Sequence, residues 1–358
     1  MLRSNINDLE NFEQHMQAFE QFQMQIYAGM DMQVLLIYLV LFLMVHFFVG
    51  LAFPFGGLRQ PIFWSFFGNV ATSMTKRLNR QKREASTLVS RGLIFGAIMM
   101  LLAYIMGDFF RQITEMQHPL MQKYAWIAVI GLWMGTINFV LPLLLLKKNM
   151  KDLEEGREVK AKARLQPFCS ADLSDADAHK IARYTAEASI ALFTQMFIGP
   201  LFWFVLAGGY GLFCYVVLAA AYRQLNFLGV AQTGYASAIT RLYRFFDYLP
   251  QKLSYIFAFM ALMAAPMAKP MVAWKNRKSH DGADAFGRLY HLIAYGFSSV
   301  LGGRYRHVTG VAVERPWYGA GDASAKMPAK DLNKIMILLL LMVSFVAVML
   351  SFLIFYMK

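Results

Sequence analysis

The sequence predicts an all-α, polytopic integral membrane protein with about five or six membrane segments. Hydrophobic residues make up 58% of the 358 residues and charged residues only 16%, against roughly 45–50% and about 25% in soluble globular proteins. The apolar residues gather in long runs, and the basic residues fall between those runs. Disordered, collagen-like and coiled-coil classes are therefore excluded. The two cysteines, Cys169 and Cys214, are too few for a disulfide framework.

Six stretches reach or approach the length of a membrane-spanning helix, which needs about 20 apolar residues to cross ~30 Å of hydrocarbon. In order, they are residues 32–53, 92–107, 124–146, 197–221, 253–268 and 335–357. Two of them, 92–107 and 253–268, are short, and the latter contains Pro266. Gly208 and Gly209 interrupt the stretch 197–221, which predicts either one long span or a re-entrant hairpin.

Two parts of the chain are distinguished by composition. Residues 1–31 are predicted to form an amphipathic leader helix that lies on the membrane or on the protein. Residues 32–358 are predicted to form one helical membrane domain. The first span is expected to remain in the mature protein, because Pro54 and Phe55 follow it instead of a small-residue cleavage site.

The distribution of Lys and Arg predicts the sidedness of the connections. The connections after the first and third stretches are rich in these residues and are expected in the cytoplasm. Residues 108–123 contain only two basic residues, Arg111 and Lys123, and are expected outside. Strict alternation would then place 222–252 outside, although it is basic, and 269–334 inside, so that Asn226 and Glu314 would lie on opposite sides. We expect a broken or re-entrant element to resolve this conflict.

The net charge of +13 is explained by these basic connections. Such residues contact anionic headgroups, so a lipid bilayer is the expected partner and nucleic acid is not. Several catalytic signatures are missing from the sequence: a Gly-Lys dipeptide for a phosphate-binding loop, a pair of histidines four residues apart, and a Gly-x-Ser-x-Gly elbow.

A set of polar motifs in the C-terminal half is the best guide to a site. Tyr222-Arg223-Gln224-Leu225-Asn226 leaves an apolar run, Phe246-Asp247-Tyr248-Leu249-Pro250 follows a short helix, and residues 313–321 form a glycine-rich loop. Each motif can equally be a helix end or a turn. An arginine cluster with few acids could hold an anionic small molecule without catalysing a reaction, and Arg223, Arg241 and Arg304 are the candidates.

Together these motifs resemble the membrane proteins CobD and CbiB, the adenosylcobinamide-phosphate synthases, and their relative AmpE. The resemblance rests on the order of many short motifs over roughly residues 55–350. They are residues 60–64, residues 77–80, Glu187, residues 199–203, Gly208-Gly209, Tyr222-Arg223, Asn226, Gly234-Tyr235, Arg241-Leu242, residues 248–250, Leu253, Glu314, Pro316-Trp317, Gly319 and Gly321.

The synthase branch carries out an ATP- and magnesium-dependent amide bond formation, and magnesium requires carboxylate oxygens. Most acids of the synthase pattern are replaced in this sequence. The replacing residues are Ala191, Gln195, Gly229, Tyr243, Arg244 and Ala320. Glu187, Asp247, Glu314 and Asp322 remain as possible metal ligands.

The resemblance implies an AmpE-like, multi-pass protein of the bacterial inner membrane. Its role would be regulatory or sensory, connected with cell-wall recycling and β-lactamase induction, on a catalytically degenerate scaffold. The alternative is a divergent adenosylcobinamide-phosphate synthase that uses magnesium and ATP, and a third hypothesis is a structural subunit without a ligand. The candidate ligand-binding residues are Glu187, Arg223, Asn226, Arg241, Asp247, Glu314 and Trp317. No catalytic residue, cofactor or protein partner is singled out.

Overall fold

The computed structural model describes residues 37, 39–45, 60–79, 84–114, 119–276, 286–319 and 325–356. The predicted leader helix at 1–31 and most of the predicted span at 32–53 lie outside the described residues. The described chain is mostly helical, with several helices long and apolar enough to cross a membrane. The predicted class, a polytopic helical membrane protein, is confirmed.

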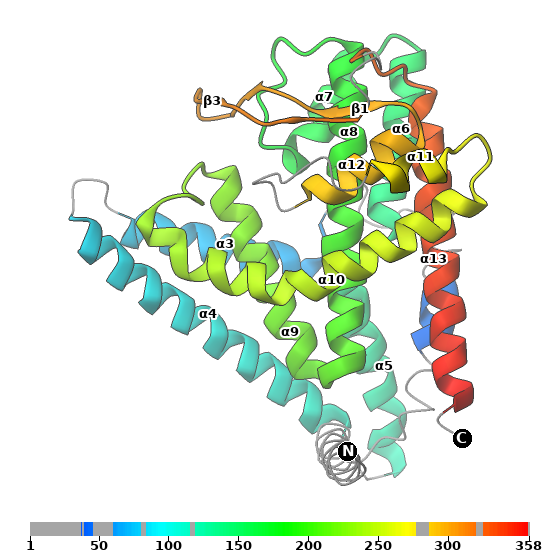
Figure 1. Ribbon diagram of the computed structural model, residues 1–358. Helices are drawn as coiled ribbons and strands as arrows, with labels where there is room; N and C mark the ends of the chain where they lie inside the picture. The colour runs from blue at the N-terminus through cyan, green and yellow to red at the C-terminus, as the bar shows by residue number, and fades with distance from the viewer. Residues whose placement is uncertain are drawn as a thin grey trace, which may run out of the picture.

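The elements follow one another along the chain as a series of helices with one region of short strands (Figure 1). The helices are α3 (Ile62–Leu78), α4 (Ala85–Thr114), α5 (Pro119–Thr136), α6 (Val140–Glu154), α7 (Glu158–Leu165), α8 (Ala178–Phe193), α9 (Gly199–Phe227), α10 (Ser237–Ala264), α11 (Pro270–Lys275), α12 (Gly287–Gly296) and α13 (Asp331–Tyr356). Short helical turns are η1 (Gln166–Phe168), η2 (Thr194–Ile198) and η3 (Gly234–Ala236), and the strands are β1 (Val300–Gly302), β2 (Tyr305–Arg306), β3 (Ala312–Val313) and β4 (Trp317–Gly319).

Three helical stretches of the described chain can each cross a membrane: Ala85–Ile113, Ala178–Phe227 and Asp331–Phe355. A fourth candidate combines α5 and α6, which are bent by 46° at the break between them. The described residues thus hold three or four candidate spans, against the five or six expected for the whole chain. The predicted segment 253–268 is not among them. It belongs to the amphipathic helix α10 and to the turn that follows.

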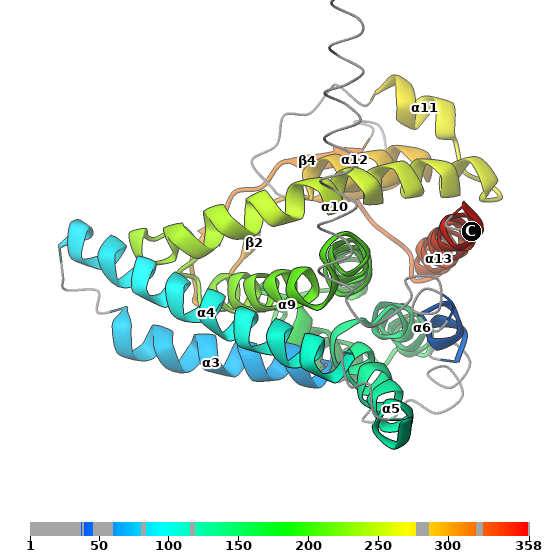
Figure 2. The ribbon, with the colours of Figure 1, turned by 90° about the horizontal axis from the view of Figure 1, so that it is seen from below.

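The predicted break in the stretch 197–221 is found at Ala207 and Gly208, whose backbone angles are non-helical. The ring of Tyr215 packs directly against Gly199, although sixteen residues of straight helix would separate them by about 24 Å. Figures 1 and 2 show the second part of α9 turning away from the axis of α8 and running beside α3 and α4. After the turn, the Tyr210 hydroxyl donates a hydrogen bond to Asp108 (3.0 Å). The helix therefore doubles back, as the glycines indicated.

This hairpin brings residues 222–252 to the segments that strict alternation would place across the membrane. The Arg223 guanidinium lies 5.5 Å from the centre of the Phe168 ring. The Asn226 backbone carbonyl hydrogen-bonds Nε2 of His307 at 2.9 Å. Because residues in direct contact share one side of a membrane, strict alternation is wrong for this part of the chain, and the broken element accounts for the contact.

The region 300–319 departs from an all-α fold. β1 pairs antiparallel with β4, with Val300 opposite Gly319, and β2 pairs antiparallel with β3. A single bridge between Ala171 and His307 connects this region to the chain after η1. The sequence gives no alternating pattern here, because strands of two or three residues are too short to show a period of two.

Candidate functional site

Glu187 is the acid that connects α8 to the strand region. Its residue is only 5% exposed. One carboxylate oxygen accepts a hydrogen bond from the backbone N–H of Gly302 (2.7 Å), and the other forms an ion pair with Arg315. The Tyr290 hydroxyl donates to the Glu187 backbone carbonyl (3.1 Å). Both oxygens of this carboxylate are therefore engaged within the protein, as is typical of buried acids.

Arg223 on α9 is the cation whose charge has no acceptor among the described residues. Both terminal nitrogens of its guanidinium are buried, and no described residue accepts a hydrogen bond from either. The guanidinium carbon lies over the face of the Phe168 ring, 5.5 Å from the ring centre. A buried guanidinium needs compensation by an anion or by acceptor oxygens, because removal from water is costly.

Arg183 on α8 lies near the same region. It is 4% exposed, and its guanidinium lies 4.8 Å from the centre of the Trp317 ring and 5.4 Å from that of Tyr184. One of its terminal nitrogens donates to the backbone carbonyl of Ala325 (3.4 Å). The Trp317 ring itself is 51% exposed and lies against Gly303.

The Cys169 thiol connects these side chains electrostatically. Burial raises its pKa to about 12, and the charges that act on it are those of Glu187, Arg315 and Arg223. These three charged groups consequently lie within electrostatic reach of the Cys169 thiol beside η1. With Arg183 they give three arginines to one carboxylate, which favours an anionic ligand. We call these four residues the arginine cluster.

Four of the seven residues expected from the sequence are exposed or have other partners, namely Arg241, Glu314, Asn226 and Asp247. Arg241 is exposed on α10. Glu314 pairs with Arg304 at 3.0 Å in a surface ion pair whose side chains are 76% and 69% exposed. Asn226 lies at the end of α9, where its side-chain amide donates to the Tyr222 carbonyl (3.0 Å). Sequence reasoning missed Arg183 and Arg315, although Arg315 stands beside Glu314 in the last motif.

Asp247 is the centre of a separate buried network. It is 1% exposed, and its carboxylate accepts hydrogen bonds from Tyr215 (2.7 Å), Tyr243 (2.8 Å) and Gln251 (2.6 Å). The Gln195 amide in turn donates to the Tyr243 hydroxyl (3.0 Å). The network joins α9, η2 and α10, so Asp247 holds the hairpin and α10 together.

The pH dependence of stability is expected to depend on Asp247. Burial raises the pKa of its carboxyl, more than the three hydrogen bonds lower it. The folded protein then holds this proton more tightly than the unfolded chain, so the stabilisation is complete below the unfolded pKa and is lost as pH rises through the folded pKa. We expect the thermal stability of the wild type, relative to Asp247→Asn, to increase from pH 7 to about pH 4. Parallel pH profiles of the two proteins would contradict this.

The described residues do not fit a magnesium site of the kind that the synthase resemblance implies. Within the described part of the chain, no three His, Cys, Asp or Glu side chains lie close enough together to hold a metal ion. Gln195 and Tyr243, at positions where the resemblance implies acids, hydrogen-bond each other. An amide and a phenol are poor replacements for the carboxylates that Mg²⁺ prefers. Ala320 and Asp322 lie outside the described residues.

The candidate spans, the helical hairpin and the arginine cluster define a polytopic helical membrane protein with a buried cationic site. Comparison with known families identifies which one: the sequence matches the family described as CobD/Cbib protein over residues 43–339. The chain belongs to this family. No curated protein and no solved structure matches it significantly.

Proposed function

We propose that this protein is a regulatory or sensory member of the CobD/CbiB family, AmpE-like in role and resident in the bacterial inner membrane. The observation that carries the proposal is the hydrogen bond between Gln195 and Tyr243. Two positions that are acidic in the synthase pattern are in contact here and carry neutral side chains. This contact supports the proposal that the carboxylates needed for a metal site have been replaced at this place.

The same network supports a structural use of what remains. The carboxylate of Asp247 is occupied by three donors, and that of Glu187 by Gly302 and Arg315. Neither would bind a cation without breaking these contacts. A divergent synthase would need a different set of ligands from those that the described residues provide.

We propose further that the sensed ligand is an anionic small molecule. The arginine cluster supports this. Arg223 contributes a buried guanidinium with both terminal nitrogens available, and Arg183 contributes a second one beside Trp317. Guanidinium groups form paired hydrogen bonds with carboxylates and phosphates. Among the described residues of the cluster, Glu187 is the one carboxylate, and it is already paired with Arg315.

Complementation tests the loss of synthase activity. In a host that lacks its own adenosylcobinamide-phosphate synthase, the wild-type gene is expected to leave cobalamin synthesis unrestored, with a working synthase as the positive control. Protein levels in the membrane fraction must be equal for both. Restored cobalamin synthesis would contradict the proposal.

In its own host, deletion of the gene is expected to change the amount of β-lactamase produced after a β-lactam is added.

Anion binding is tested with inorganic phosphate as the probe and with two arginine variants of the same helical region. Phosphate is expected to raise the Tm of the wild type and of Arg241→Gln, and to leave that of Arg223→Gln unchanged, because a ligand stabilises only the protein that binds it. Arg241 is exposed and serves as the matched control. An equal phosphate-induced shift in all three proteins would show that Arg223 does not hold the anion.

A further inference from the structure

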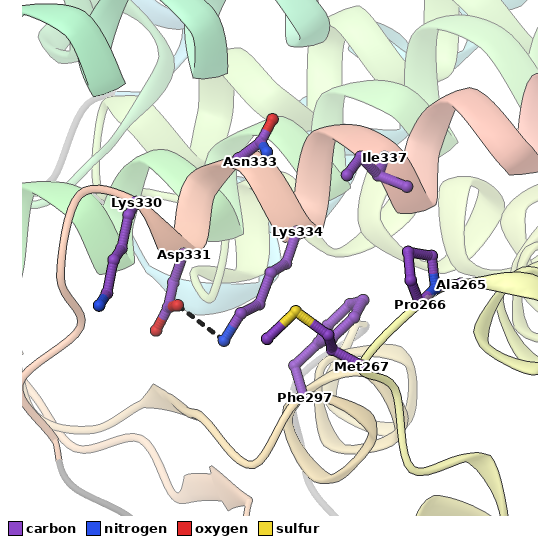
Figure 3. Close-up of a pocket in the computed structure, with 9 residues that line it drawn as sticks. All are labelled: Ala265, Pro266, Met267, Phe297, Lys330, Asp331, Asn333, Lys334 and Ile337. Atoms are coloured by element: carbon purple, nitrogen blue, oxygen red, sulfur yellow. Dashed lines mark ion pairs between the residues drawn. The ribbon is translucent and has the colours of Figure 1, made fainter.

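A cavity at the beginning of α13 lies apart from the arginine cluster. Its volume is about 310 Å³, and its lining includes Met267, Phe297, Lys330, Asp331, Lys334 and Ile337. Figure 3 shows Asp331 and Lys334 on the side of α13 that faces Met267 and Phe297. The Lys334 ammonium pairs with Asp331 at 2.8 Å. Two lysines against one aspartate leave this lining with a net positive charge.

The position of α13 indicates how deep in the bilayer this cavity lies. The helix has 26 residues, which corresponds to a length of about 39 Å, whereas the hydrocarbon core of a bilayer is about 30 Å thick. Asp331–Phe355 is the most apolar of the candidate spans, and only 28% of its most apolar part is buried inside the protein. Its charged first turn must therefore lie in the headgroup layer, and the cavity lies there with it.

The chain between α10 and α11 supports the same depth. Met267 has a left-handed backbone conformation (φ 67°) and is 81% exposed. Met263 is 60% exposed and Met271 71% exposed. An ordinary soluble surface rarely exposes such a group of apolar side chains, whereas the boundary between headgroups and acyl chains favours it. The exposed Lys269 precedes α11 and the exposed Lys275 is its last residue, an arrangement typical of an interfacial segment.

We propose that this cavity binds an anionic phospholipid of the surrounding bilayer. The phosphate contacts Lys330 and Lys334, and the beginning of the acyl chains packs against Ile337 and Met267. The charge of the lining matches an anionic headgroup, and its apolar part faces the direction in which α13 enters the hydrocarbon. The proposal is independent of the function proposed for the arginine cluster.

The test compares lipid retention by the full-length protein in detergent after mixing with phosphatidylglycerol or phosphatidylcholine, measured by native mass spectrometry. The Lys330→Gln/Lys334→Gln variant is expected to bind phosphatidylglycerol about 30-fold more weakly, since each lysine near a membrane surface contributes roughly a factor of five. The control is Lys160→Gln/Lys180→Gln, which removes the same charge from two exposed lysines on α7 and α8. It is expected to bind like the wild type.

Three results would overturn the proposal. The first is equal phosphatidylglycerol binding by both double variants, and the second is equal binding of phosphatidylcholine and phosphatidylglycerol by the wild type. The third is binding of soluble glycerol phosphate by the wild type that equals its binding of phosphatidylglycerol. The last result would assign the cavity to a free phosphate compound instead of a lipid. The four exchanged lysines are at least partly exposed, and gel filtration of each variant checks that it is folded.

Discussion

Replacing Glu187 by alanine is expected to lower the free energy of unfolding by about 3–5 kcal/mol, enough to prevent accumulation of folded protein in a marginally stable chain. The substitution leaves the Arg315 guanidinium, which is only 18% exposed, without its carboxylate. It also removes the acceptor of the Gly302 N–H, which holds β1 against α8. The measurement is thermal unfolding of the purified protein in detergent, together with its yield in membranes.

Glu314→Ala is the matched control, because Glu314 also pairs with an arginine in the same strand region. Its partner Arg304 and Glu314 itself are both exposed, and exposed ion pairs contribute roughly 0–1 kcal/mol. We expect this variant to unfold within a few degrees of the wild type. Similar losses in the two variants would mean that the Glu187–Arg315 pair is not the buried connection described above.

Replacing Gly208 by valine is expected to have the second largest effect. Gly208 has φ 57° and ψ −147°, a region that only glycine enters without strain, and other residues lose about 1–3 kcal/mol there. A β-branched side chain adds further clashes. Without this turn the second part of α9 cannot return, and Tyr215 loses its place at Asp247. We expect poor folding, measured as a lower Tm and lower yield.

Gly131→Ala provides the comparison for this prediction. Gly131 lies in α5, and a methyl group there meets nothing within 4 Å. Alanine has the higher helix propensity, so the variant is expected to be as stable as the wild type or slightly more stable. A Gly208→Val protein as stable as Gly131→Ala would show that the chain does not need the left-handed turn.

The membrane class and the hairpin could be predicted from the sequence because both depend on local composition. The apolar run at 335–357, which forms α13, reaches the length that a bilayer requires, and the glycines after residue 207 indicate where the helix breaks. The stretch 253–268, which the sequence shows to be short and to contain Pro266, does not form a separate span. Its amphipathic pattern continues from Ser237 as one helix.

The candidate site was less accessible to sequence reasoning, because its charges come together through long-range contacts. Arg183 and Arg315 are 132 residues apart in the sequence. No local sequence pattern indicates that Glu187 pairs with Arg315. The expected grouping of Arg241 and Glu314 with Arg223 assumed that nearby motifs share one surface. In the structure, Arg241 and Glu314 face the outside. In the segment between β3 and β4, the Arg315 side chain is largely buried against Glu187, whereas that of Glu314 is exposed beside Arg304.

The doubling back of α9 also determines how the chain can be inserted during synthesis. Ala178–Phe227 would enter the bilayer as a paired loop, so both of its ends stay on the side from which it was delivered. The basic residues around its beginning, such as Lys160 and Lys180, and those after its end, such as Arg241 and Arg244, then remain together on that side. This agrees with the known retention of positive charge at the cytoplasmic face. A hairpin of this kind spares the cell the transfer of an arginine-rich segment against the membrane potential.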